Sequence, residues 1–302
     1  MATLSERYQW QWRPQLRKRS YAGLVKLFNG LTWLLPPLGK LALHSATAVN
    51  RPLDYARGNL RINAESWVEY EKRAHSCAKE PKTVQWIEEF IEEGDVVYDI
   101  GANVGAYSLV IAERLCEKVK IYAFEPSFST FSQLSKNVWI NNFGGIVYPM
   151  YVALAAKTEL QFFNYSSVET GTALHGLETE GEPVEFKAAY KQPIMSYRLD
   201  DLIEQFGVEP PNHIKLNVDG IECAVLGGAE QTLRHPQLKS VIVELEETRP
   251  GATSIQSLLE NAGFQLKSEH IHNQNPFHPG PYVRNCVFTR ADAKSAANEQ
   301  AA

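Results

Sequence analysis

The chain lacks the marks of several protein classes. Among its 302 residues are four cysteines, and no two of them have the spacing of zinc ligands or of a redox pair. We therefore expect free thiols in a reducing, cytoplasmic environment rather than a disulfide scaffold. The start has no basic stretch followed at once by an apolar run, so we expect no secretory signal. The most apolar segment, Leu24 to Leu43, is interrupted by two lysines and by Pro36-Pro37, which makes it too broken to span a bilayer.

Acidic residues are nearly absent from the first fifty positions. These positions contain seven Lys/Arg and one acid, Glu6, whereas the remaining residues contain 23 Lys/Arg and 34 Asp/Glu. The net charge of -5 excludes a general nucleic-acid binder. Residues 17–43 have a basic start and leucines at helical spacing, which predicts an amphipathic helix. Such a helix suits peripheral contact with an anionic membrane. We favour instead its packing on the protein's own domain or on a second copy in a homo-oligomer.

The most informative stretch joins a strand to a helix through a glycine turn. Val96 to Gly105 read as a buried strand with an acid, Asp99, near its end, then a turn that begins with Gly101, then a helix. Glu125 follows twenty residues after Gly105, directly behind a second apolar strand. This layout is typical of a nucleoside site at the carboxyl edge of a parallel sheet. The alternative is a glycine turn that merely closes a strand–helix joint.

The details of the turn favour one nucleoside. A dinucleotide site needs a glycine in the middle of the turn so that a pyrophosphate can approach the backbone, and Asn103 stands there. Asp99 can face an ammonium directly or through water, and Glu125 can accept hydrogen bonds from both hydroxyls of an unphosphorylated ribose. We therefore predict S-adenosylmethionine as the cofactor. Val152 and Ala153, behind the third strand, are expected to border its adenine.

Strands and helices alternate along residues 55–290, which predicts one α/β domain with a parallel sheet covered by helices on both faces. The expected strands are Val96–Tyr98, Val119–Phe124, Ile146–Val152, Ile214–Leu216 and Val241–Leu245, with Phe264–Lys267 and Cys286–Thr289 as a closing hairpin that makes one edge strand antiparallel. Residues 160–197 read as a β-rich insertion near the site, residues 1–54 as a helical extension, and residues 291–302 as a disordered tail.

Several blocks resemble the FkbM family of S-adenosylmethionine-dependent methyltransferases. They are Asp-Ile-Gly-Ala-Asn-Val-Gly at 99–105, Phe-Glu-Pro at 124–126, Ile-Lys-Leu-Asn-Val-Asp-Gly at 214–220 with Val-Leu-Gly-Gly-Ala at 225–229, and the lead-in from Lys79 to Trp86. The resemblance covers about residues 65–290. It implies a class I methyltransferase, Rossmann-like, with a seven-stranded sheet, and O-methylation of sugars, polyketides or related metabolites. The family usually reads Asp-Val-Glu-Gly where this chain has Asn217, Val218, Asp219 and Gly220, so a catalytic or metal role of that motif does not carry over directly.

An alcohol acceptor needs help in losing its proton, and three residues are candidates for that role. Asp219 and Glu244 lie at the ends of strands four and five, where the methyl group is expected, and His272 lies in a loop that can arch over the site. We favour Asp219 as the base or as an acid that positions the acceptor, with Asn217 beside the cofactor. The alternatives are a helix cap for Asp219, a buried ion pair for Glu244 and a solvated loop position for His272.

The sequence therefore predicts an S-adenosylmethionine-dependent methyltransferase that methylates a hydroxyl of a small molecule or a glycan. We predict no metal site, because His270 and His272 with Glu269 lack a fourth ligand at a defined spacing. Two alternatives stay open. One is a non-catalytic binding protein that keeps the fold, which the changed residues at 217 and 219 allow. The other is an NAD-dependent oxidoreductase, which Asn103 disfavours.

Overall fold

A seven-stranded sheet forms the centre of the molecule. The computed structural model describes residues 14–116, 118–173, 175–177, 187–246, 252–271 and 283–290. The strand order is β12-β13-β11-β10-β3-β4-β5, and all neighbours are parallel except the two pairs that β13 makes. The strands are β3 (Val96–Ile100), β4 (Lys120–Phe124), β5 (Val147–Met150), β10 (His213–Leu216), β11 (Ser240–Glu246), β12 (Phe264–Ile271) and β13 (Val283–Arg290). The predicted seven-stranded, mostly parallel sheet of an α/β protein is thus confirmed.

The closing hairpin differs from the prediction in one respect. β12 and β13 do pair as an antiparallel hairpin, but the antiparallel strand β13 lies inside the sheet, between β11 and β12. The edge strand β12 runs parallel to the others. Burial explains the order, because four consecutive residues of β13, Asn285–Phe288, are buried, whereas the middle of β12 is exposed. A strand with a solvated face suits the edge of a sheet.

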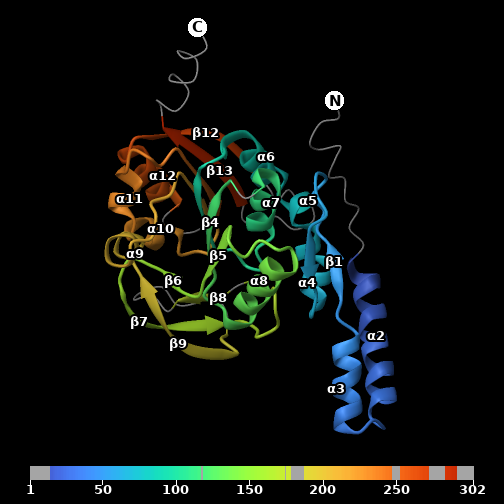
Figure 1. Ribbon diagram of the computed structural model, residues 1–302. Coiled ribbons are helices and arrows are strands. Elements are labelled where there is room, and N and C mark those ends of the chain that lie inside the picture. Colours follow the sequence, from blue (N-terminus) through green and yellow to red (C-terminus); the bar gives the residue numbers. More distant parts are fainter. Residues whose placement is uncertain are drawn as a thin grey trace.

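Helices cover both faces of the sheet, as Figure 1 shows. One face packs against α6 (Pro81–Phe90), α7 (Ala106–Leu115) and α8 (Phe128–Ile140). The other packs against α9 (Leu199–Phe206), α10 (Glu222–Gly227), α11 (Glu230–Arg234) and α12 (Ala252–Asn261). Because each central strand is buried on both sides, β3 and β10 have no exposed residue, as is usual for parallel strands between two helical layers.

A second, smaller sheet lies beside the carboxyl edge of the first. It has the order β6-β9-β7-β8, with β6 (Ala153–Leu154), β7 (Glu159–Tyr165), β8 (His175–Leu177) and β9 (Tyr190–Tyr197). This sheet corresponds to the β-rich insertion predicted at residues 160–197, of which residues 174 and 178–186 lie outside the described part of the chain.

The N-terminal helices form a hairpin that extends away from the body (Figure 1). α2 (Pro14–Thr32) and α3 (Pro37–Ala46) are joined by a short turn, and between residues 17 and 50 every residue is exposed except the half-exposed Thr32 and Gly39. Little of the hairpin is thus buried on the protein's own domain, and its packing on a second copy stays a prediction. Near its start α2 contacts the body, where Arg17 pairs with Glu71 and Tyr21 packs on Trp67. None of the helices in the described part of the chain is long and apolar enough to cross a membrane.

Short elements link this hairpin to the sheet. A two-stranded sheet of β1 (Asn50–Pro52) and β2 (Arg61–Asn63) is followed by α4 (Trp67–Glu71), the 3-10 helix η1 (Arg73–His75) and α5 (Ser76–Lys79). α4 begins at Ser66 with a capping box, in which Ser66 Oγ accepts from the Glu69 backbone N–H and Glu69 bonds back to Ser66. η1 and α5 bring their side chains to the carboxyl edge of the large sheet.

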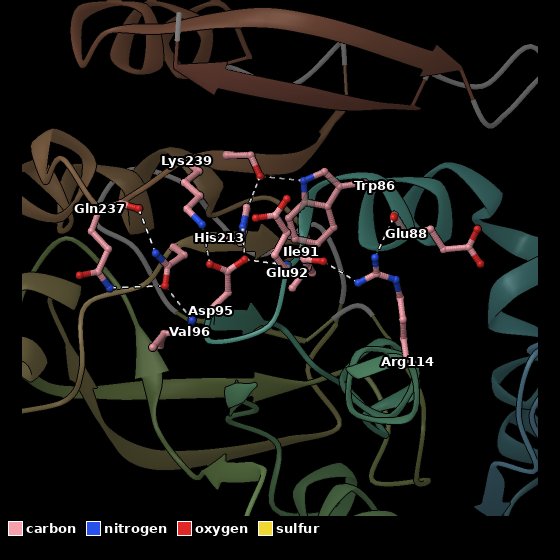
Figure 2. A network of polar contacts seen from close by, with 12 residues as sticks. Trp86, Glu88, Ile91, Glu92, Asp95, Val96, Arg114, His213, Gln237 and Lys239 are labelled. Atoms are coloured by element: carbon pink, nitrogen blue, oxygen red, sulfur yellow. Dashed lines mark hydrogen bonds and ion pairs between the residues drawn. The ribbon is translucent and has the colours of Figure 1, made fainter. Parts of the chain in front are cut away.

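The amino ends of the central strands are tied by a buried polar network (Figure 2). His213 lies between Asp95 and Ser240, with its Nε2 3.0 Å from Asp95 Oδ2 and its Nδ1 2.7 Å from Ser240 Oγ. Trp86 Nε1 donates to the same Ser240 oxygen, and Lys239 Nζ donates to Asp95 Oδ1 at 2.6 Å. Burial lowers the pKa of His213, so the ring is neutral and its Nε2–H donates to Asp95.

Asp95 carries the charge of this network. Burial alone would disfavour its ionised form, but hydrogen bonds from His213, Lys239 and the Glu92 backbone hold its pKa at about 2. Although the residue types are Ser, His and Asp, the three side chains are buried at the amino edge of the sheet, opposite the expected ligand site. The network therefore joins three strands and α6 rather than serving as a nucleophilic centre.

Candidate functional site

A cavity opens at the carboxyl ends of β3, β4, β10 and β11, where ligands of α/β sheets are found. It brings together most of the residues that the sequence analysis selected: Gly101, Asn103, Glu125, Val152, Ala153, Asn217, Asp219 and Glu244. Asp99 and Gly105 do not line it. His272 lies outside the described residues.

The two glycines of the turn have different roles. Gly101 has φ +74°, and a Cβ there would overlap the backbone carbonyl of Asn217. The loop after β10 thus packs directly on the turn after β3, which only glycine permits. Gly105 has φ +83°, and a Cβ there would lie 2.5 Å from Leu134 Cδ1 in α8. Gly105 therefore allows helix packing behind the turn and does not face the cavity.

Asn103 occupies the middle of the turn in a left-handed conformation, with φ +51°. Asparagine tolerates this conformation better than most residues. Its Nδ2 donates to the carbonyl of Thr172 at 3.0 Å, and its Oδ1 accepts from the Val104 N–H. The side chain thus ties the turn to the segment before β8.

Glu125 ends β4 with its carboxylate buried against the turn. Oε2 accepts from the Asn103 backbone N–H and Oε1 from the Ser127 backbone N–H, both at 2.9 Å. Burial raises the pKa of Glu125 to about 7, although the two backbone hydrogen bonds favour its charged form. An ionised carboxylate has about four acceptor positions. Two therefore stay available to donors in the cavity.

Asp99 is placed differently from the prediction. It is fully buried, and its oxygens accept from Lys215 Nζ at 2.9 Å and from Ser108 Oγ at 2.6 Å. The structure therefore does not place Asp99 in direct contact with a ligand ammonium, because its two oxygens bond to these two side chains. Lys215 itself lines the cavity, with Nζ 5.4 Å from the centre of the Tyr107 ring. Asp99 acts on the cavity by holding Lys215.

Asn217 and Glu244 form the polar pair at the ends of β10 and β11. Asn217 Nδ2 donates to Glu244 Oε2 at 3.1 Å. Burial and the nearby charge of Glu80 raise the pKa of Glu244 to about 7, against the effect of Lys79. The alternative of a buried ion pair for Glu244 does not account for this hydrogen bond, whose donor is an uncharged amide. A carboxylate with a pKa near neutrality accepts and releases protons under physiological conditions.

Asp219 lines the same cavity and does not cap the following helix. The N-cap of α10 is Ile221, which makes no side-chain cap, and Glu222 Oε1 instead accepts from the backbone N–H groups of Val218 and Gly220. Asp219 has φ +56°, a left-handed conformation that Asp adopts more readily than most residues. Its charge acts on Glu125, His175 and Glu244 across the cavity.

Sequence reasoning missed several charged or polar lining residues. Arg73 comes from η1, Lys79 from α5 and Glu80 from the residue before α6, whereas Tyr107, His175 and Lys215 come from α7, β8 and β10. Three of them left a signal. Lys215 is a charge inside a buried strand, and Lys79 and Glu80 belong to the lead-in that resembles the FkbM family. His175 left no signal, because its neighbours in the sequence are unremarkable.

In the described part of the chain, no group of three or more His, Cys, Asp or Glu side chains has the arrangement of a metal site. The cavity is instead a mixed-charge site, with cations on η1 and β10 and carboxylates at the ends of β4, β10 and β11. Such a site suits a ligand that carries both signs of charge, or neutral hydroxyls next to charged groups.

Comparison with known proteins gives a consistent result. A model of the Methyltransferase FkbM domain matches residues 99–266. Hexuronic acid methyltransferase AglP of Haloferax volcanii is 29% identical over 191 residues, which cover 63% of this chain and 70% of that protein. 31-O-demethyl-FK506 methyltransferase FkbM of Streptomyces tacrolimicus is 25% identical over 228 residues, or 66% of this chain and 82% of that protein. Among solved structures, methyltransferase FkbM from Methylobacillus flagellatus aligns with a TM-score of 0.43 and 12% identity over 72% of this chain and 55% of that one.

Proposed function

We propose that this chain, which belongs to the FkbM family of methyltransferases, transfers the methyl group of S-adenosylmethionine to a hydroxyl oxygen of a sugar, a glycan or a related metabolite. One observation carries the proposal: a single cavity holds a buried carboxylate at the end of β4 and a second, proton-accepting carboxylate at the end of β11. The first suits a ribose and the second an acceptor hydroxyl.

The residues of the cavity fit this cofactor. Glu125 keeps acceptor positions for two ribose hydroxyls beyond its two backbone hydrogen bonds. The methionine part of the cofactor is a zwitterion, and the cavity offers Arg73 and Lys215 to its carboxylate and Glu80 to its ammonium. Asn103 puts a side chain where a dinucleotide site has glycine, which supports a cofactor without phosphate and counts against NAD. When bound, S-adenosylmethionine supplies a methyl group activated by a sulfonium.

Glu244 is the residue best suited to take the proton of the acceptor hydroxyl. Asn217 holds Oε2 of Glu244 through a hydrogen bond of 3.1 Å, which leaves Oε1 for the acceptor. With a pKa of about 7, this carboxylate is largely ionised slightly above neutral pH and still basic enough to accept a proton. In this role Glu244 would take the proton of the acceptor hydroxyl, to which the bound cofactor would supply the methyl group. Asp219 borders the same space and positions the acceptor.

The names of the relatives support an oxygen acceptor on a polar small molecule. One relative acts on a hexuronic acid, and the name of another specifies a 31-O position. Hydroxyl groups are common to both substrates. Alignment of such a hydroxyl with the methyl group and the sulfur on one line is the main contribution that a site of this kind makes to the rate.

A label-transfer assay tests the proposal. The full chain is incubated with S-adenosylmethionine labelled in its methyl group and with a panel of uronic acids, neutral sugars and polyols, next to a panel of amines. Transfer of label to a hydroxyl compound, lost in Glu244→Gln, supports the proposal. Transfer to amines alone contradicts the O-methylation, and calorimetry that detects no binding of S-adenosylmethionine contradicts the cofactor.

A further inference from the structure

The α2–α3 hairpin exposes an unusual amount of apolar surface. Trp33, Leu34 and Leu38 around the turn are 76%, 79% and 76% exposed. Further along the two helices the exposed apolar side chains are Leu24, Leu27, Phe28, Leu31, Leu41 and Leu43. α3 has no buried residue at all. A group of this size on one projecting element is typical of a docking surface, because isolated exposed leucines are common but contiguous ones are not.

The hairpin is held at its base and open at its tip. Tyr21 contacts Trp67 of α4 with ring centres 5.0 Å apart, and Arg17 forms an ion pair with Glu71 at 3.3 Å. Both contacts lie near the start of α2. The turn around Pro36 and Pro37 therefore projects outward, far from these contacts, as Figure 1 shows. This geometry presents the most apolar residues first to any surface that the hairpin approaches.

The charges of the hairpin have one sign. No Asp or Glu occurs between Glu6 and Asp54, whereas this stretch contains the exposed cations Lys18, Arg19, Lys26 and Lys40. The residues after position 50 hold 23 Lys/Arg and 34 Asp/Glu, so the rest of the chain is acidic. Between Lys26 and Lys40 no charged residue interrupts the apolar tip. A tryptophan and leucines at the tip, with lysines and arginines behind them, are the residues of a segment that lies in a membrane interface.

We propose that the hairpin docks this methyltransferase on an anionic lipid surface, with the Trp33–Leu38 turn in the boundary between headgroups and acyl chains and the flanking cations on the headgroups. The acidic body would then face away from the membrane, held off by its charge. A second copy of the chain is a poorer occupant, because symmetric pairing of two hairpins would place cations against cations without any acid between them. The proposal does not depend on the methyl acceptor.

Vesicle co-sedimentation of the full chain tests the docking. Vesicles of phosphatidylcholine alone are compared with vesicles in which part of this lipid is replaced by phosphatidylglycerol. We expect the protein to pellet with the anionic vesicles, to pellet much less with the neutral ones, and to be released by salt. Absence of pelleting with the anionic vesicles would overturn the proposal.

Matched variants separate the hairpin from the rest of the surface. Trp33→Ser/Leu34→Ser removes two tip residues, and Trp139→Ser/Leu160→Ser removes the same residue types from the body at similar exposure, 77% and 68%. We expect the first variant to reduce the partition coefficient at least ~100-fold, given about 1.5 kcal/mol or more for each of the two large apolar side chains. The second is expected to leave it unchanged. Equal effects of the two variants would contradict docking through the tip.

The charges are tested in the same way. Lys26→Gln/Lys40→Gln is expected to weaken binding about fivefold for each lysine, because a basic residue near an anionic surface contributes about 1 kcal/mol. Lys157→Gln/Lys187→Gln, which removes two exposed lysines of the body, is the control. Light scattering without vesicles completes the test. A dimer that the tip variant dissociates, together with no vesicle binding, would identify a second copy as the occupant and refute the lipid surface.

Discussion

The hydrogen bond between Asn217 and Glu244 leads to a sharp prediction about the pKa of a proton acceptor. Asn217→Asp replaces the donor of a 3.1 Å hydrogen bond by a second carboxylate. Two like charges about 4 Å apart repel by about 4 kcal/mol at an effective dielectric constant of about 20, which equals about 3 pKa units. Because the side chains can move apart, we expect a rise of about 2 units from the wild-type pKa of Glu244, which is about 7.

Carbon-13 NMR of protein labelled at the glutamate carboxyl carbons measures this shift without knowledge of the acceptor. Glu244→Gln identifies the signal. Asn217→Ala is the matched control, since it removes the donor without adding a charge and should move the midpoint by less than about 1 unit. In Asn217→Asp the two carboxylates titrate as a coupled pair, and the upper midpoint is the one to compare. A wild-type midpoint near the ordinary value of 4.5, or equal midpoints in all three proteins, would refute the reasoning.

Three further predictions concern the cofactor, the turn and the polar network. Glu125→Ala should weaken binding of S-adenosylmethionine in calorimetry by about 100-fold, because two hydrogen bonds to a charged group are lost. Its circular dichroism should match that of the wild type. Equal affinities of the variant and the wild type for the cofactor would refute the ribose role. Gly101→Ala should lower the free energy of unfolding by about 3 kcal/mol or more, because its Cβ would meet a backbone carbonyl. Gly94→Ala is the control, since Gly94 has φ +89° with open space around it, and it should lower the free energy of unfolding by only about 1 kcal/mol. Similar losses for the two variants in urea unfolding would contradict the close approach at Gly101. The contribution of Asp95 to the stability of the fold should be lost as the pH falls from about 4 toward about 2, because its pKa is held at about 2 against 3.8 in a free side chain; the difference in urea unfolding between the wild type and Asp95→Asn should shrink over this range, and a constant difference would refute it.

The local features of the site could be predicted from the sequence. The strand, the glycine turn and Glu125 lie within thirty residues of one another, and each depends on a neighbouring stretch of chain whose pattern is regular. The seven strands were likewise predicted because parallel strands between helical layers are continuous apolar runs. The antiparallel position of β13 was not predicted, since it depends on which of two strands has the more solvated face.

The partners of the side chains could not be predicted, because they come from distant parts of the chain. Asp99 is neutralised by Lys215, which lies 116 residues away on an adjacent strand. Asn217 and Glu244 are 27 residues apart and meet only when β10 and β11 pair in register. The helix-cap alternative for Asp219 failed because Glu222, three residues later, bonds to the same loop. Local patterns thus identified the residues of the cavity, and tertiary contacts decided what each of them does.

A crystal structure of the full chain with S-adenosylhomocysteine would decide whether the cavity at the carboxyl edge is a methyl-transfer site. We expect both ribose hydroxyls on the Glu125 carboxylate and the sulfur directed toward the space beside Asn217 and Glu244. A ligand bound elsewhere, or a ribose that does not reach Glu125, would contradict this description of the site.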